Sequence, residues 1–199
     1  MEEKTIKIIF IVILIAINLV RVYYQHKSKS ENMFVLKKTK ETTSVVLFYV
    51  LFAVPSFLYV LTNAIDSLNF NFPVIIRFFG MVAIAISFWL FIWTHKTLGK
   101  NFSAILTIKK EHKLIQEGPY KRVRHPMYTA IYFMIYGFFL LSSNLLVGLL
   151  PLISFSYLYF SRVKKEEEMM LKKFGKEYEH YMQITGRLIP NRRHQWFLL

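Results

Sequence analysis

The strongest constraint on this chain is a series of long apolar stretches that alternate with basic segments. Five stretches can be marked: Ile6–Val22, Ser44–Ile65, Pro73–Trp93, Pro126–Leu141 and Leu145–Phe160. The first three approach the roughly 20 residues that a helix needs to cross the hydrocarbon core of a bilayer. Because backbone polar groups in lipid must be satisfied within a helix or a closed barrel, these stretches predict membrane helices.

The last two stretches are short, and only residues 142–144 separate them. They predict a tight helical hairpin that barely crosses the bilayer. One long buried helix is the alternative, and Asn144, Gly148 and Pro151 argue against it. The sequence therefore predicts an all-α integral membrane protein of five transmembrane helices with a short C-terminal helical hairpin. Residues 1–199 form a single membrane domain in this interpretation, and residues 1–93 hold the three N-terminal spans.

The distribution of charge predicts how the chain lies in the membrane. The net charge is +14, and the basic residues gather in segments 21–41, 94–125 and 161–199. The links at 63–72 and 142–144 contain no Lys or Arg. Since Lys and Arg accumulate in cytoplasmic loops, we expect a multi-pass protein with its N-terminus outside and its C-terminus in the cytoplasm. This placement assigns the basic charge to anionic membrane lipids, so nucleic acid is not expected as a partner.

The segment Arg162–Tyr181 has the pattern of a cytoplasmic amphipathic helix, with its apolar residues in one stripe. Glu167 falls in the middle of that stripe and Glu166 at its edge. A buried carboxylate needs a positive partner or remains protonated. Arg162 lies four residues before Glu166 and can pair with it. A row of solvated glutamates at a helix start is the alternative, and both interpretations of Glu166 and Glu167 stay open at this point.

The loop before the fourth apolar stretch contains a second candidate region. Residues 118–120 form a Gly-Pro-Tyr turn, and Pro126 suits the first position of a helix. Arg124 and His125 then stand at the N-terminal edge of that helix, where N–H groups suit an anion such as a carboxylate or phosphate. Anchoring among lipid headgroups is the alternative, which position alone favours. Tyr128 is close enough to the loop to reach a ligand.

The sequence offers no metal site. It contains no Cys, which removes thiolate ligands, disulfides and a Cys nucleophile. The other five His residues do not pair with His125 at ligand spacing, and no acid nearby completes a site.

Taken together, these motifs resemble the isoprenylcysteine carboxyl methyltransferase family, and the chain is similar to a small prokaryotic member. The resemblance covers residues 98–190, about half of the chain, and the motifs are specific as an ordered set. They are His112-Lys113-Leu114-Ile115, Gly118-Pro119-Tyr120, Val123-Arg124-His125-Pro126-Met127-Tyr128, Arg162, Glu166-Glu167, Phe174-Gly175, Tyr178 and Pro190. The N-terminal half resembles the family only in being membrane-spanning.

The resemblance implies that residues 94–190 form a methyltransferase region that uses S-adenosyl-L-methionine. The implied reaction transfers methyl to the carboxylate of a prenylated C-terminal cysteine. The implied cofactor-binding residues are His112, Lys113, Leu114, Ile115, Tyr120, His125, Pro126, Met127, Tyr128 and Glu166. The predicted catalytic residues are Arg162, Glu167 and Arg124, with Arg162 meeting the substrate carboxylate. Three acids occur at 166–168, so it stays open whether Glu166 or Glu167 binds the cofactor amine.

Two other functions remain as alternatives to the carboxyl methyltransferase. Phospholipid amine N-methyltransferases share the C-terminal signature, and a non-enzymatic membrane scaffold could bind acidic lipid through its basic loops. In the main interpretation, a lipophilic substrate enters from the bilayer and the cofactor arrives from the cytoplasm. Membrane lipids are the other expected partners, and we expect a monomer.

Overall fold

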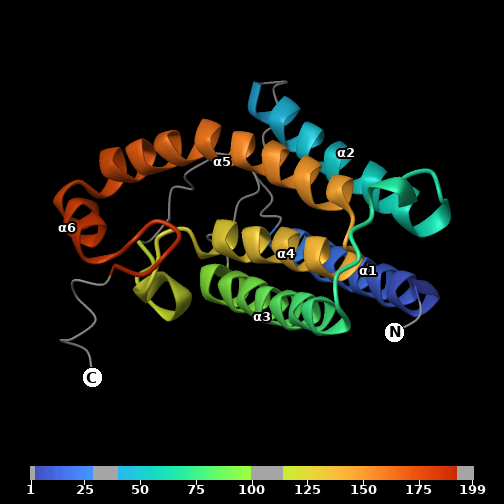
Figure 1. The fold of residues 1–199 in the computed structure, drawn as a ribbon. Helices are drawn as coiled ribbons and strands as arrows, with labels where there is room; N and C mark the ends of the chain where they lie inside the picture. Colours follow the sequence, from blue (N-terminus) through green and yellow to red (C-terminus); the bar gives the residue numbers. More distant parts are fainter. Residues whose placement is uncertain (1–2, 29–39, 100–113, 192–199) are drawn as a thin grey trace.

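The chain folds into a bundle of helices, seen in Figure 1. The computed structural model describes residues 3–28, 40–99 and 114–191. In these ranges no strand forms, and two isolated bridges pair Asn69 with Asn144 and Val123 with Gly186. The elements are α1 (Glu3–Ser28), α2 (Lys40–Leu61), η1 (Asp66–Leu68), α3 (Val74–Leu98), η3 (Gly118–Lys121), α4 (Pro126–Ser142), α5 (Leu145–Phe174) and α6 (Lys176–Ile184).

The helices lie in two layers with α4 at the centre of the bundle. Figure 1 shows α2 beside α5 in one layer, and α1 and α3 beside α4 in the other. One buried cluster, which includes Phe10, Tyr59 and Phe138, joins α1, α2 and α4. A second cluster, which includes Phe48, Tyr128 and Phe155, joins α2, α4 and α5. The apolar faces of the predicted helices therefore pack on one another while their outer faces remain exposed.

The helices have the length and composition of membrane spans. Within the described residues, four segments are long and apolar enough to cross a bilayer: Glu3–Tyr24, Thr43–Leu61, Val74–Leu98 and Leu145–Phe174. The apolar helix α4 is shorter, with 17 residues. The prediction of an all-α integral membrane protein is confirmed, whereas the fifth span stays a prediction.

The C-terminal helices differ from the predicted arrangement. The sequence predicts a span that ends at Phe160, followed by a separate amphipathic helix from Arg162 to Tyr181. The structure instead continues α5 without a break to Phe174. No Gly or Pro stands near residue 161 to end the helix, so only its composition changes there. The break comes at Gly175, whose φ of 52° is accessible to glycine and strained for other residues. The charged half of α5 thus projects beyond the bundle and carries α6 at its end (Figure 1).

The turn between α4 and α5 is built around Asn144, which is fully buried. Its side-chain oxygen caps α5 by accepting hydrogen bonds from the backbone N–H groups of Leu146 and Val147. Its amide nitrogen donates to the carbonyl of Ile65 at 2.8 Å and to Oδ1 of Asn69 at 2.7 Å. One side chain therefore caps the start of α5 and fastens the turn to the link between α2 and α3.

Helices α3 and α4 pack closely because two glycines face each other. A Cβ atom placed on Gly137 would lie 2.6 Å from Cγ1 of Ile84 and 2.9 Å from the carbonyl oxygen of Gly80. Nearby, the hydroxyl of Ser87 donates a 2.7 Å hydrogen bond to the carbonyl of Ala130. Small residues let helix backbones approach in this way when no hydrophobic effect drives helices together in lipid.

Replacing Gly137 by alanine should separate α3 from α4, because part of the clash is with backbone that cannot rotate away. Overpacking of this kind costs about 1–3 kcal/mol. We expect a lower midpoint of thermal unfolding in detergent. Tyr136→Ala is the control, since this neighbouring side chain is exposed. Equal midpoints for the two variants would contradict the close approach.

Candidate functional site

The polar centre of the molecule is Glu167, a carboxylate on the inner side of α5. It is 5% exposed. Arg124 contacts it at 3.1 Å and is itself buried. Arg187 grips both of its oxygens, with Nη2 at 2.6 Å from Oε2 and Nε at 3.1 Å from Oε1. This hydrogen bonding to Glu167 raises the pKa of Arg187. The sequence predicts a positive partner for a carboxylate in the apolar stripe. In the structure two arginines fill this role.

The neighbouring carboxylate, Glu166, has different surroundings. The hydroxyl of Tyr128 donates a 2.6 Å hydrogen bond to its Oε1. Nε of Arg162, one turn earlier on α5, lies 3.4 Å from the same oxygen. The Glu166 side chain is 22% exposed, against 7% for Glu167. Glu166 therefore keeps access to a ligand, whereas the arginines occupy Glu167.

His125 lies between the two carboxylates at the start of α4. Its Nδ1 is 3.6 Å from Oε2 of Glu166, and its Nε2 is 3.4 Å from Oε1 of Glu167. The helix begins at Pro126, as the sequence predicts. The positive end of α4 and the His125 ring thus face two carboxylates that belong to the protein itself.

Residues 185–188, which follow α6, run alongside the start of α4. The backbone N–H groups of Arg124 and His125 donate to the carbonyls of Gly186 and Arg187 at 2.8 and 3.0 Å. The hydroxyl of Thr129 donates to the carbonyl of Leu188 at 2.9 Å. These bonds satisfy amide groups that the sequence analysis considered for an outside anion. We call residues 185–188 the closing segment.

Arg124 also connects the closing segment to Glu167, to which Arg187 of that segment binds directly. Besides its ion pair, its Nη1 donates to the carbonyl of Met182 at 3.0 Å and to the carbonyl of Thr185. Its guanidinium is therefore used inside the protein, and a catalytic role for Arg124 stays a prediction. The same applies to the role predicted for Glu167.

The Gly-Pro-Tyr turn forms η3 and packs between α3 and α6. Gly118 has a φ of 57°, and a Cβ atom there would lie 2.7 Å from Oγ1 of Thr97. The carbonyl of Tyr120 accepts a 2.6 Å hydrogen bond from the hydroxyl of Tyr181. Burial raises the pKa of the Tyr120 hydroxyl well above its usual value, so this group stays protonated.

The structure brings together most of the residues predicted for the site. Arg124, His125, Tyr128, Arg162, Glu166 and Glu167 form one connected cluster. Pro126 and Met127 belong to the first turn of α4, while Leu114 and Ile115 precede η3. His112 and Lys113 lie outside the described residues.

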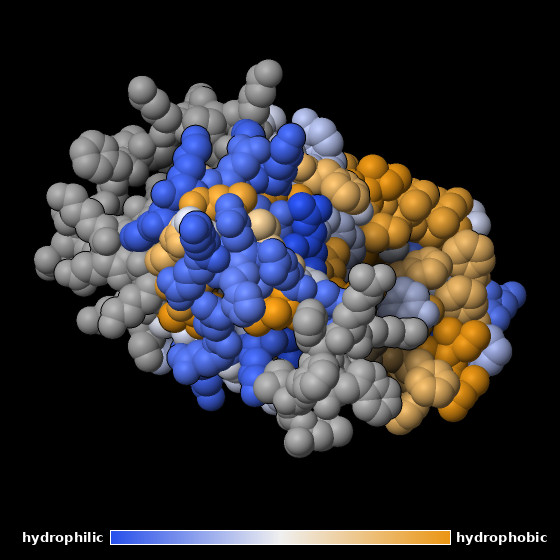
Figure 2. Space-filling model, turned by 90° about the vertical axis from the view of Figure 1, so that its left-hand side faces the viewer, coloured by the Kyte–Doolittle hydropathy of each residue, from blue (hydrophilic) through white to orange (hydrophobic). Residues whose placement is uncertain are grey.

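Sequence reasoning missed Arg187. It belongs to no motif that the sequence analysis recognised, and 20 residues separate it from Glu167. A signal existed, because a carboxylate in the middle of an apolar stripe requires positive charge from elsewhere in the fold. Figure 2 shows the end of the molecule that carries α6, where hydrophilic side chains gather beside an apolar flank. The cluster lies in this polar end.

Comparison with known proteins agrees with the resemblance drawn from the motifs. The family model described as Phospholipid methyltransferase matches residues 75–177, just over half of the chain. The protein-S-isoprenylcysteine O-methyltransferase of Schizosaccharomyces pombe is 32% identical over 94 residues, which cover 46% of this chain and 40% of that protein. The enzyme of the same name from Saccharomyces cerevisiae is 34% identical over 100 residues, covering 47% and 40%. The chain thus matches less than half of the length of these relatives.

A solved structure resembles a larger part of the chain. It is that of the eukaryotic intramembrane Ras methyltransferase, isoprenylcysteine carboxyl methyltransferase. The TM-score is 0.54 at 26% sequence identity, and the similarity covers 86% of this chain and 60% of the other. The family resemblance seen in the sequence is confirmed: the chain belongs to the phospholipid methyltransferase family, and its relatives there are isoprenylcysteine carboxyl methyltransferases.

Proposed function

We propose that this protein is an S-adenosyl-L-methionine-dependent methyltransferase that methyl-esterifies the carboxylate of a lipid-tailed, isoprenylcysteine-like acceptor at the membrane. The observation that carries the proposal is the contrast between two adjacent carboxylates. Arginines neutralise Glu167, while Glu166 stays partly exposed beside Tyr128 and Arg162. A partly exposed carboxylate suits the ammonium group of the cofactor. The names and activities of the relatives point to the same chemistry.

The residues present fit the cofactor. The Glu166 carboxylate would pair with the ammonium group of the cofactor, and contacts from His125 and Tyr128 hold this carboxylate in place. The cofactor supplies a methyl group that is already activated on a sulfonium. The remaining residues that would bind it are Leu114, Ile115, Tyr120, Pro126 and Met127, with His112 and Lys113 in the preceding part of the chain.

Methyl transfer to a carboxylate requires little acid or base catalysis from the protein. It is ionised at pH 7, so its attack needs no general base. The protein has to align the two partners and keep water away. In this proposal Arg162 orients the acceptor carboxylate, since a guanidinium can make two parallel hydrogen bonds to it. The acceptor tail stays in the bilayer, and the site opens to the cytoplasm, the side that the basic segments assign to it.

The first test is binding of S-adenosylhomocysteine to the detergent-solubilised protein by calorimetry. A saturable 1:1 isotherm supports an enzyme, and no binding at millimolar ligand would leave the scaffold alternative.

The second test compares acceptors. Because the family is described as Phospholipid methyltransferase, a phospholipid amine is the alternative acceptor. The assay therefore compares methyl transfer to a farnesylated cysteine analogue with methyl transfer to phosphatidylethanolamine. We expect methyl transfer to the carboxylate, because the Arg162 guanidinium can pair with a carboxylate acceptor.

Arg162→Ala should lower turnover of the farnesylated acceptor by about one to two orders of magnitude. Losing one charge-assisted hydrogen bond costs roughly 1.5–3 kcal/mol, and each 1.36 kcal/mol is about tenfold in rate. Arg162→Lys should restore only part of the rate, because it keeps the charge and loses the fork. Cofactor affinity is measured on the same variants. If cofactor affinity falls in parallel with turnover, Arg162 acts by positioning Glu166, and the proposed role in binding the acceptor is wrong.

A further inference from the structure

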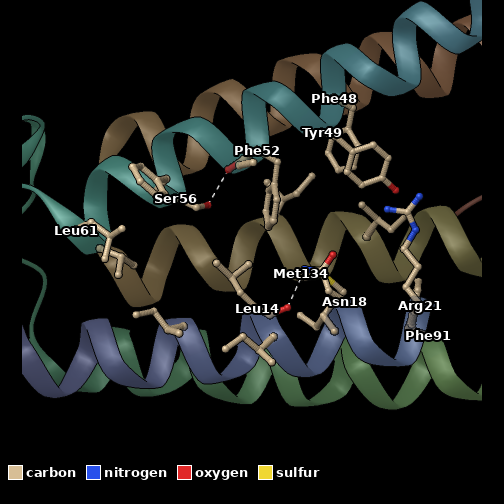
Figure 3. Close-up of a pocket in the computed structure, with 18 residues that line it drawn as sticks. Leu14, Asn18, Arg21, Phe48, Tyr49, Phe52, Ser56, Leu61, Phe91 and Met134 are labelled. Atoms are coloured by element: carbon tan, nitrogen blue, oxygen red, sulfur yellow. Dashed lines mark hydrogen bonds between the residues drawn. The ribbon is translucent and has the colours of Figure 1, made fainter. Parts of the chain in front are cut away.

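An apolar groove of about 460 Å³ runs along the bundle. Its walls come from α1, α2 and α4, with Phe91 contributed by α3. Figure 3 shows Phe52 of α2 and Leu14 of α1 on opposite walls of the groove, with Met134 of α4 behind. Most of the lining is aliphatic or aromatic. A groove with this lining suits a hydrocarbon chain.

One end of the groove carries positive charge. The guanidinium carbon of Arg21 lies 4.1 Å from the centre of the Tyr49 ring, and Figure 3 shows the two side chains turned toward each other at that end. Arg21 stands on α1 where its apolar stretch finishes. One turn further on, the ring of Tyr24 lies 4.8 Å from that of His95, near the C-terminus of α3. Lys and Arg near the ends of membrane spans commonly meet the phosphate groups of a bilayer.

Packed side chains separate the groove from Glu166. Phe48 lines the groove and packs on Phe155 with ring centres 5.0 Å apart. Tyr128, whose hydroxyl binds Glu166, lies in the same buried cluster, 5.9 Å from Phe155 between ring centres. Phe48 and Phe155 therefore lie between the groove and Tyr128. The cation among the residues that line the groove is Arg21.

We propose that this groove binds one hydrocarbon chain of an anionic membrane phospholipid, with the headgroup phosphate on Arg21. The guanidinium matches a phosphate because it donates parallel hydrogen bonds and is only weakly hydrated. Tyr49 holds it at the mouth by stacking. The helix α1 has most of its outer face exposed, so a bound chain fills the space between it and α2 and completes its packing. This inference does not depend on the proposed methyltransferase activity.

The test measures lipid binding by native mass spectrometry, using dioleoyl phosphatidylglycerol added to delipidated protein in detergent. Four variants are compared with the unchanged chain. Arg21→Ala removes the cation, and Arg21→Lys keeps only its charge. Ala53→Phe adds bulk to the groove wall. Val54→Phe is the matched control, because this neighbouring residue points away from the groove and is exposed. Elution as a single species verifies that each variant is folded.

We expect one tightly held phosphatidylglycerol per chain, with affinity at least tenfold weaker in Arg21→Ala and in Ala53→Phe. Arg21→Lys should fall between, and Val54→Phe should bind like the unchanged chain. Added phosphatidylglycerol should also raise the unfolding midpoint of the unchanged chain more than that of Arg21→Ala. If all variants retain phosphatidylglycerol equally, the lipid is bound nonspecifically and the proposed site is overturned. Displacement of the lipid by a farnesylated cysteine analogue, with the same variants affected, would assign the groove to the methyl acceptor and also overturn the proposal.

Discussion

Glu167→Ala should destabilise the protein more than any other single substitution in the carboxylate cluster. It removes the one anion that Arg124 and Arg187 share, and it leaves the buried Arg124 guanidinium without its carboxylate. Breaking a buried ion pair in this way costs about 3–5 kcal/mol. Thermal unfolding in detergent, followed by circular dichroism, should show a clearly lower midpoint. Glu168→Ala provides the control, since this glutamate is exposed on the same turn of α5.

A second comparison shows whether the loss comes from unpaired charge. Arg187→Gln alone should lower the unfolding midpoint less than Glu167→Ala does, because the Arg187 side chain is 54% exposed and Arg124 still pairs with Glu167. The double variant Glu167→Gln with Arg187→Gln should be less destabilised than the sum of the two single variants, because the pair disappears together. Strict additivity would mean that the two residues do not act through each other.

Glu166→Gln should weaken binding of S-adenosylhomocysteine by about one to two orders of magnitude and leave the fold intact. An amide keeps the hydrogen bond to Tyr128 but loses the charge that attracts an ammonium, which is worth roughly 1.5–3 kcal/mol. Calorimetry measures the affinity, and the unfolding midpoint of the free protein serves as the control for structure. Normal affinity in Glu166→Gln, combined with loss in a folded Glu167→Gln, would place the amine on the other glutamate. No loss in either variant would remove the amine site from this cluster.

Local signals in the sequence predicted much of the fold. Hydrophobic stretches of membrane length located the helices, and Pro126 marked the start of α4 because it lacks an N–H that a helix start does not need. The helical wheel also singled out Glu167 as a carboxylate in an apolar environment. These predictions succeed because each depends on residues within one or two helical turns.

Features that depend on distant residues were not predicted. Arg187 reaches Glu167 only because α6 turns at Gly175 and brings the chain back to α4. Nothing near Arg187 in the sequence signals that return. The continuity of α5 was missed for a different reason. A change from apolar to charged composition at Arg162 resembles the end of a span, whereas a helix ends only where its backbone is interrupted, here at Gly175.

The closing segment has a consequence for how the protein matures. Ribosomes deliver a chain from its N-terminus, so α1 to α6 are synthesised before residues 185–188. Until those residues arrive, Arg124 lacks the carbonyl of Thr185, and Glu167 lacks Arg187. Assembly of the carboxylate cluster is therefore a late event in biosynthesis. A chain truncated after Ile184 should contain α1 to α6 and yet lack the completed cluster.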